Sequence, residues 1–153
     1  MYNLAYKLMN DDGTLGDVRA SKQEAVKWYH EASTHFDHSG AQVNLGQYYG
    51  NLDDHVNAVY YYEKAATQGV KEAQSSLGFR YLEGRGVYQD EEKAAELLHQ
   101  AALQGHMNAM LTMGQLYYRG IGVEINERKA RHWQKKYTAA ILGAESEKWG
   151  VNW

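Results

Sequence analysis

The sequence predicts an all-α fold in which helical hairpins repeat along the chain and stack into a solenoid. Three observations favour this class. The chain has no proline and leans towards alanine and glutamate, which favours helices over strands. Segments 73–105 and 109–143 match each other position by position at a fixed spacing. Within these segments the apolar residues recur at helical intervals.

The repeating unit is a helix, a loop and a second helix. Gly84 and Gly86 in one copy correspond to Gly120 and Gly122 in the next, 36 residues later in both cases. A hairpin of this size cannot bury its apolar face alone, so neighbouring copies are expected to stack on one another.

Two further copies are less regular. Segment 41–69 lacks four residues of the loop, and segment 1–33 is the most degenerate, with a first helix at 4–8, a longer loop at 10–20 and a second helix at 21–33. We expect one domain that spans residues 1–153. Its parts are repeats at 1–37, 38–70, 71–106 and 107–143 and a C-terminal cap at 144–153.

Both helices of a repeat carry the pattern that a helix requires. In the third copy the apolar residues of the first helix fall at 73, 77 and 81, and those of the second helix at 94, 97, 98, 101 and 102. The second helices are expected to begin at N-cap residues that hold equivalent positions, and Ser21 with Glu24 forms the spacing of a capping box. These N-caps are Ser21, Asp54, Asp90 and Asn126.

Glycine has two distinct places in the repeat. Gly46, Gly78 and Gly114 lie inside first helices, where glycine costs about 1 kcal/mol relative to alanine, so we expect a partner helix to cross closely there. The loop pair Gly84 and Gly86 raises the question of a phosphate-binding loop. That loop would follow a strand and carry a third glycine at position 89, which is glutamine here, so a turn with positive φ is favoured.

The pattern A-x-x-x-L-G-x-x-Y-x-x-G-x-G-V-x-x-D-x-x-K-A, followed by a helix that ends A-A-x-x-G, resembles the Sel1-like repeat, a relative of the tetratricopeptide repeat. It is nearly complete at 73–105 and well matched at 109–143. The resemblance implies a right-handed α/α superhelix with a concave face. It also implies a non-enzymatic scaffold, adaptor or regulator that binds another protein.

The first helices would line the concave groove. Their helical neighbours on either side of the central Leu or Met are the candidates for contact with a partner, and Phe79 is the strongest because its equivalents Gln47 and Gln115 are polar. The more conservative interpretation is that such side chains belong to the core. The predicted groove residues are Tyr2, Tyr6, Val43, Gln47, Ser75, Phe79, Leu82, Leu111, Gln115 and Tyr118.

The basic segment 127–136 has two interpretations. It could attract an acidic partner or an anionic surface, or it could be a solvated helix face with Ala130 and Trp133 turned inward. The second is favoured. In the run 59–66, which lies on a second helix, Tyr61 and Tyr62 are expected to pack and Tyr60 to be exposed.

Composition excludes several classes of protein. With no cysteine there are no disulfides, thiolate metal sites or cysteine nucleophiles. A net charge of -3 gives no basis for binding nucleic acid, and no apolar stretch is long enough for a membrane span or a signal peptide. A cytoplasmic location is therefore expected.

An enzyme or metal protein is not favoured. His30 and His35 are five residues apart, whereas the zinc-protease motif needs a spacing of four, and His38 is interpreted as a solvated residue in a turn. No catalytic set and no cofactor are predicted. Trp149 and Trp153 are interpreted as a cap or a dimer contact, and the exposed terminal repeats make a homo-oligomer possible.

Two binding functions stay open. The first is an adaptor or regulator that holds a peptide or protein surface in the groove of the first helices. The alternative is a small immunity or inhibitor protein that neutralises a toxin or enzyme by direct binding. A metal-dependent enzyme is the third and least favoured class.

Overall fold

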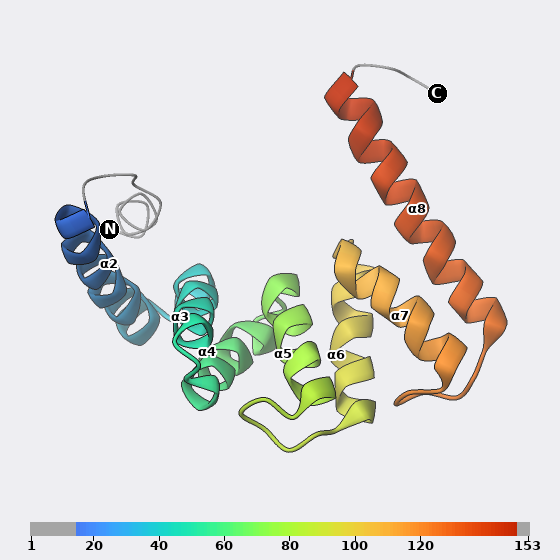
Figure 1. Ribbon diagram of the computed structural model, residues 1–153, viewed down its shortest axis with the longest axis horizontal. Coiled ribbons are helices and arrows are strands. Elements are labelled where there is room, and N and C mark those ends of the chain that lie inside the picture. The colour runs from blue at the N-terminus through green and yellow to red at the C-terminus, as the bar shows by residue number, and fades with distance from the viewer. Residues whose placement is uncertain (1–14, 150–153) are drawn as a thin grey trace. The chain divides into compact units, whose positions relative to one another are not determined.

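The structure is a computed structural model that describes the backbone of residues 15–149 and the side chains of residues 22–143. Every regular element in this part is an α-helix, so the predicted all-α fold is confirmed (Figure 1). None of these described helices combines the length and the apolar character that a membrane crossing requires. The helices are α2 (Leu15–Phe36), α3 (Ser39–Asn51), α4 (His55–Thr67), α5 (Lys71–Glu83), α6 (Glu91–Leu103), α7 (Met107–Arg119) and α8 (Glu127–Trp149).

The chain divides into two compact units, one with α2 to α4 and the other with α5 to α8. In the first unit α2 packs on α3 and α3 on α4, around a core that contains Tyr29 and Leu45. In the second unit α5 packs on α6, α6 on α7 and α7 on α8. Its core joins alanines and Leu98 of α6 to Met113 and Leu116 of α7 and to Trp133 of α8.

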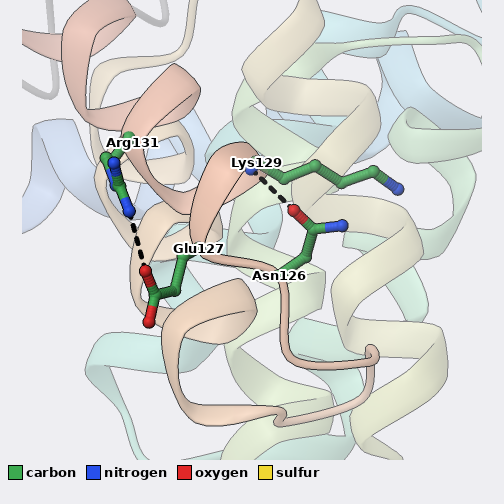
Figure 2. A network of polar contacts seen from close by, with 4 residues as sticks. All are labelled: Asn126, Glu127, Lys129 and Arg131. Atoms are coloured by element: carbon green, nitrogen blue, oxygen red, sulfur yellow. Dashed lines mark hydrogen bonds and ion pairs between the residues drawn. The ribbon is translucent and has the colours of Figure 1, made fainter.

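The N-caps of the second helices are confirmed at three of the four positions. The side chain of Asp54 accepts from the backbone N–H of Asn57 at 3.2 Å, and that of Asp90 from Lys93 at 3.0 Å. Asn126 accepts from the N–H of Lys129 at 2.9 Å (Figure 2). Such a cap stabilises its helix by about 1 kcal/mol, because it satisfies a backbone donor that the helix leaves unpaired.

The prediction for Ser21 is wrong. Helix α2 begins at Leu15, so Ser21 lies well inside a helix and cannot cap it, and the capping box with Glu24 does not form. The last part of the loop expected at 10–20 is therefore helical. Only Gly16 there disfavours a helix, and it falls in the first turn of α2.

Histidines cap two of the first helices, a role that the sequence pattern did not predict. The ring Nδ1 of His38 accepts from the N–H of Ala41 at 3.2 Å, and His106 accepts in the same way from Ala109 at 3.3 Å. Only a neutral imidazole can accept such a bond. Burial lowers the pKa of His106 and so favours the neutral form.

The glycines inside the first helices lie where the paired helix approaches closely, as predicted. A Cβ on Gly78 would stand 2.8 Å from Leu98 Cγ, and one on Gly46 would stand 2.7 Å from the ring of Tyr62. The approach at Gly114 is looser, with the Ala130 carbonyl oxygen at 3.4 Å. Each contact joins the two helices of one repeat.

The predicted glycine turn is confirmed. Gly84 and Gly120 end α5 and α7 in the left-handed region, with φ of 67° and 72°. The second glycine of each pair also has positive φ. At Gly122 a side chain is excluded for another reason, because its Cβ would collide with the carbonyl oxygen of Glu91 at the start of α6.

A buried glutamine that accepts from an exposed one recurs in both units. Gln42 is fully buried and its Oε1 accepts from Gln68 at 2.8 Å, and Gln74 accepts from Gln104 at the same distance. Gln68 and Gln104 also donate to backbone carbonyl oxygens, at 3.1 Å and 2.9 Å. The buried amides also donate, Gln42 Nε2 to Asp37 Oδ1 at 2.6 Å and Gln74 Nε2 to Gln100 Oε1 at 3.0 Å, so both are hydrogen-bonded and their burial is tolerable.

Candidate functional site

The predicted groove residues differ in how exposed they are in the structure. Tyr2 and Tyr6 lie outside the described residues. On α3, Val43 is half-buried and Gln47 is exposed. Ser75 of α5 is only 3% exposed, so its side chain is not open to a partner.

Phe79 and Leu82 of α5 are partly buried and pack against the core of the second unit. Phe79 is therefore only partly open to a partner, and its role as a groove residue stays a prediction. The open first-helix surface of this unit lies on α7 instead. There Leu111 is 38% exposed and Tyr118 is 69% exposed, and Gln115 between them is exposed as well.

The residues on α7 form one wall of an open hollow, which we call the α7–α8 groove. It has a volume of about 420 Å³, and the opposite wall comes from α8. The groove is lined by Leu111, Gly114, Gln115, Tyr118, Arg119, Glu127, Ala130, Arg131 and Gln134. Three of the predicted residues thus meet in one place, with an α8 wall that the sequence pattern did not predict.

The α8 wall is polar and charged. Arg131 Nη2 lies 2.7 Å from Glu127 Oε2, one helical turn earlier (Figure 2). Both side chains are about two-thirds exposed or more, at 72% and 67%, so this pair contributes little to stability. Arg131 lines the same groove as the apolar side chains of α7.

The other basic side chains of α8 differ in their surroundings. Lys129 Nζ stands 5.0 Å from the ring centroid of Tyr117, and Lys136 Nζ stands 5.3 Å from that of Trp133. Figure 2 shows Lys129 and Arg131 pointing to different sides of α8. Ala130 and Trp133 are buried, as predicted, at 8% and 4% exposure. The solvated-face interpretation holds for most of this segment, whereas Arg131 faces the groove.

His30, which belongs to the histidine pair that resembles a zinc-protease motif, makes hydrogen bonds to two tyrosines. His30 Nε2 lies 3.1 Å from the hydroxyl of Tyr49 and Nδ1 lies 3.0 Å from that of Tyr61, so one ring joins α2, α3 and α4. Burial lowers the pKa of His30 and is the main cause that raises the pKa of both tyrosines. Among the described residues, no three His, Asp or Glu side chains are placed to hold a metal ion.

The tyrosines of α4 lie as predicted. Tyr62 is 7% exposed and Tyr61 is half-buried, whereas Tyr60 is 50% exposed with Lys64 Nζ 5.1 Å from its ring centroid. These contacts describe a packed helix with one exposed aromatic ring.

The fold and this site define an α-helical repeat protein of the solenoid class. The family model for the Sel1 repeat matches residues 1–35, 39–70, 71–106 and 108–136. The chain belongs to the Sel1 repeat family. Proteins of this family are generally protein-interaction modules and typically not enzymes.

The solved structures similar to this chain include a protective antigen and a bacterial Sel1 repeat protein. One is c5321, a protective antigen present in uropathogenic Escherichia coli strains displaying an SLR fold, with 32% identity over 93% of this chain and a TM-score of 0.75. The chain spans 33% of the length of that protein. The other is a Sel1 repeat protein from Oxalobacter formigenes, with 28% identity, a TM-score of 0.68, and coverage of 77% of this chain and 92% of that one. No curated protein shows a significant match.

Proposed function

We propose that this chain is an adaptor or regulator that binds a peptide or a protein surface, and that α7 supplies the contact in the second unit. The observation that carries the proposal is the exposure of Leu111 and Tyr118 on the wall of an open groove. Exposed apolar side chains beside a hollow are typical of binding sites, because burial by a partner removes them from water.

Tyr118 is suited to act as an anchor. An aromatic side chain brings a large contact area and loses few rotors when it is immobilised. Gln115 between the two apolar residues offers amide groups for hydrogen bonds that would set the orientation of a bound chain. On α3 of the first unit, Val43 and Gln47 hold equivalent positions and are proposed to contribute in the same way. A cytoplasmic location, consistent with the absence of cysteine, is part of the proposal.

Affinity capture from the native cell tests the proposal. The wild-type chain is compared with a variant that combines Leu111→Ala and Tyr118→Ala, and the captured proteins are identified by mass spectrometry. We expect the variant to lose a partner that the wild type retains, with affinity at least about tenfold weaker.

The control variant is Tyr88→Ala. Tyr88 is 98% exposed in the loop before α6 and does not line the groove, so its removal tests for a general effect of losing an exposed tyrosine. If the double variant captures the same proteins as the wild type, the α7–α8 groove is not the binding surface.

A further inference from the structure

The repeat itself indicates what the α7–α8 groove would accept. One repeat earlier, the corresponding wall of α6 is covered by α7 of this same chain. That wall consists of Ala95, Leu98 and Ala102, which are 2%, 0% and 1% exposed and share a core with Met110 and Leu116 of α7. The place equivalent to the groove is thus filled by a helix within the structure.

The fourth repeat keeps the hairpin but changes that wall. At a spacing of 36 residues, Arg131 replaces Ala95, Gln134 replaces Leu98 and Thr138 replaces Ala102. All three replacements are exposed. The hollow continues along α8 past Thr138, with a further volume of about 460 Å³ that Lys135 and Leu142 also line.

A helix with the apolar face of α7 would fit this wall poorly. It would cover the Gln134 amide without offering a partner and would remove the Arg131–Glu127 pair from water, and both effects disfavour docking. The polar side chains of α8 therefore disfavour a helix with an apolar face like that of α7. They favour a helix that turns polar side chains towards α8.

The α7 wall keeps exposed apolar side chains. Leu111 stands at the position of the buried Ser75, Gln115 at that of Phe79, and the exposed Tyr118 at that of Leu82. One wall of the groove thus presents Leu111 and Tyr118 on either side of Gln115, and the other is polar. A helix that satisfies both walls must itself be amphipathic, with an apolar stripe beside a polar one.

The charges around the groove indicate which charge the polar stripe of an incoming helix should carry. Arg119, Arg131 and Lys135 line the two hollows on this side, and Glu127 is the one acidic residue among their lining residues. Three positive charges against one negative charge favour acidic side chains on an incoming helix.

We propose that the α7–α8 groove docks an acidic amphipathic helix of a partner protein, in the place that α7 takes on α5 and α6 one repeat earlier. The apolar stripe of that helix covers Leu111 and Tyr118, and its acidic stripe meets Arg131 and Lys135. This inference rests on the proposed function and narrows it to one kind of partner.

Fluorescence anisotropy with the full chain tests the inference. The probes are two stapled helical peptides of about four turns with the same leucine stripe, flanked on one side by glutamates in one peptide and by lysines in the other. We expect the wild type to prefer the glutamate probe, with an affinity that weakens as salt rises. Arg131→Glu should weaken the glutamate probe about fivefold and strengthen the lysine probe.

The controls separate charge from packing. Arg131 is 72% exposed at its side chain, so its substitution leaves the fold intact, which circular dichroism checks. Tyr118→Ala should weaken both probes, and Tyr88→Ala should change neither. Equal binding of the two probes, or an Arg131→Glu variant with unchanged preference, would overturn the inference.

The remaining outcomes distinguish this inference from the proposed function. If the Leu111 and Tyr118 variant loses a captured partner while neither probe binds, the groove is an interface but not for an acidic helix. If the wild type is a dimer that Tyr118→Ala dissociates, a second copy of this chain fills the groove, and the inference is wrong. If the capture is also unaffected, both the inference and the proposed function fail.

Discussion

The substitutions Gly78→Ala and Gly114→Ala should shift stability in opposite directions, although they make the same change at equivalent positions of one unit. The prediction follows from the distance between the paired helices. A Cβ at residue 78 would lie 2.8 Å from Leu98 Cγ and 3.3 Å from the Ala94 carbonyl oxygen. At residue 114 the nearest atom is the Ala130 carbonyl oxygen at 3.4 Å, an ordinary contact.

Two terms set the magnitude. Alanine in place of glycine inside a helix gains about 1 kcal/mol in either case. At residue 78 the added methyl also overpacks the core, at a cost of about 1–3 kcal/mol, because it would meet Cγ of the fully buried Leu98. We expect Gly78→Ala to lose about 1 kcal/mol net and Gly114→Ala to gain about 1 kcal/mol.

Thermal and urea unfolding measure both values. For a chain of this size a change of 1 kcal/mol shifts Tm by about 3 °C, so Gly78→Ala should melt lower than the wild type and Gly114→Ala higher. The double variant should show the sum of the two shifts. If Gly78→Ala is as stabilising as Gly114→Ala, the close approach of α5 and α6 is not the reason for glycine at that position.

Three further predictions concern pH, capping and the α8 wall. Burial lowers the pKa of His30 below its ordinary value of 6.5. The contribution of His30 to stability should therefore be complete above pH 6.5 and should decline as the pH falls from there through the folded-state pKa. Urea unfolding across this pH range should show a weaker decline in stability for His30→Gln than for the wild type. Asp90→Ala should lower the free energy of unfolding by about 1 kcal/mol while Asp90→Asn retains most of it, and equal losses would show that the cap is not responsible. Replacing Arg131, Gln134 and Thr138 by Ala, Leu and Ala restores the apolar wall of α6 on α8, so the variant should self-associate in light scattering; a monodisperse variant at wild-type mass would contradict the role given to this wall.

The parts of the fold that could be predicted are those set by local chemistry. The caps at Asp54, Asp90 and Asn126 and the turns at Gly84 and Gly120 depend on a few neighbouring residues, and each recurs in the same register. Ser21 failed because the match in the first repeat is weak, and nothing at 15–20 stops a helix strongly enough.

The burial of groove residues could not be predicted, because it depends on the neighbouring repeat. Phe79 and Gln115 hold the same position in their repeats, yet Phe79 packs against the core and Gln115 is exposed. The same holds for the buried Ser75 and the exposed Leu111. Equivalent positions in a repeat have equivalent backbones but not equivalent surroundings.

The α8 wall could not be predicted from the positions at which the repeats match, because its signal lies in the positions at which they differ. At the aligned positions of the two repeats, Arg131 replaces Ala95 and Gln134 replaces Leu98, so polar residues stand where the preceding repeat has small or apolar ones. Both changes fall at positions that the preceding repeat buries. A polar residue at a position that the preceding repeat buries indicates that this wall does not suit the apolar face of a helix such as α7.

The difference between the two walls also bears on how tightly a partner can bind. A short connection joins α7 to α6 of the third repeat, so the apolar wall of α6 acts on a helix that is already present at high effective concentration. A helix from another protein has no such connection and loses translational and rotational freedom when it docks. The affinity for such a helix must come from apolar anchors such as Tyr118, and the preference for an acidic helix must come from the positive charge of Arg131. A single helix in this groove is therefore expected to bind with a Kd on the order of micromolar, and a tighter complex would require contacts beyond the α7–α8 groove.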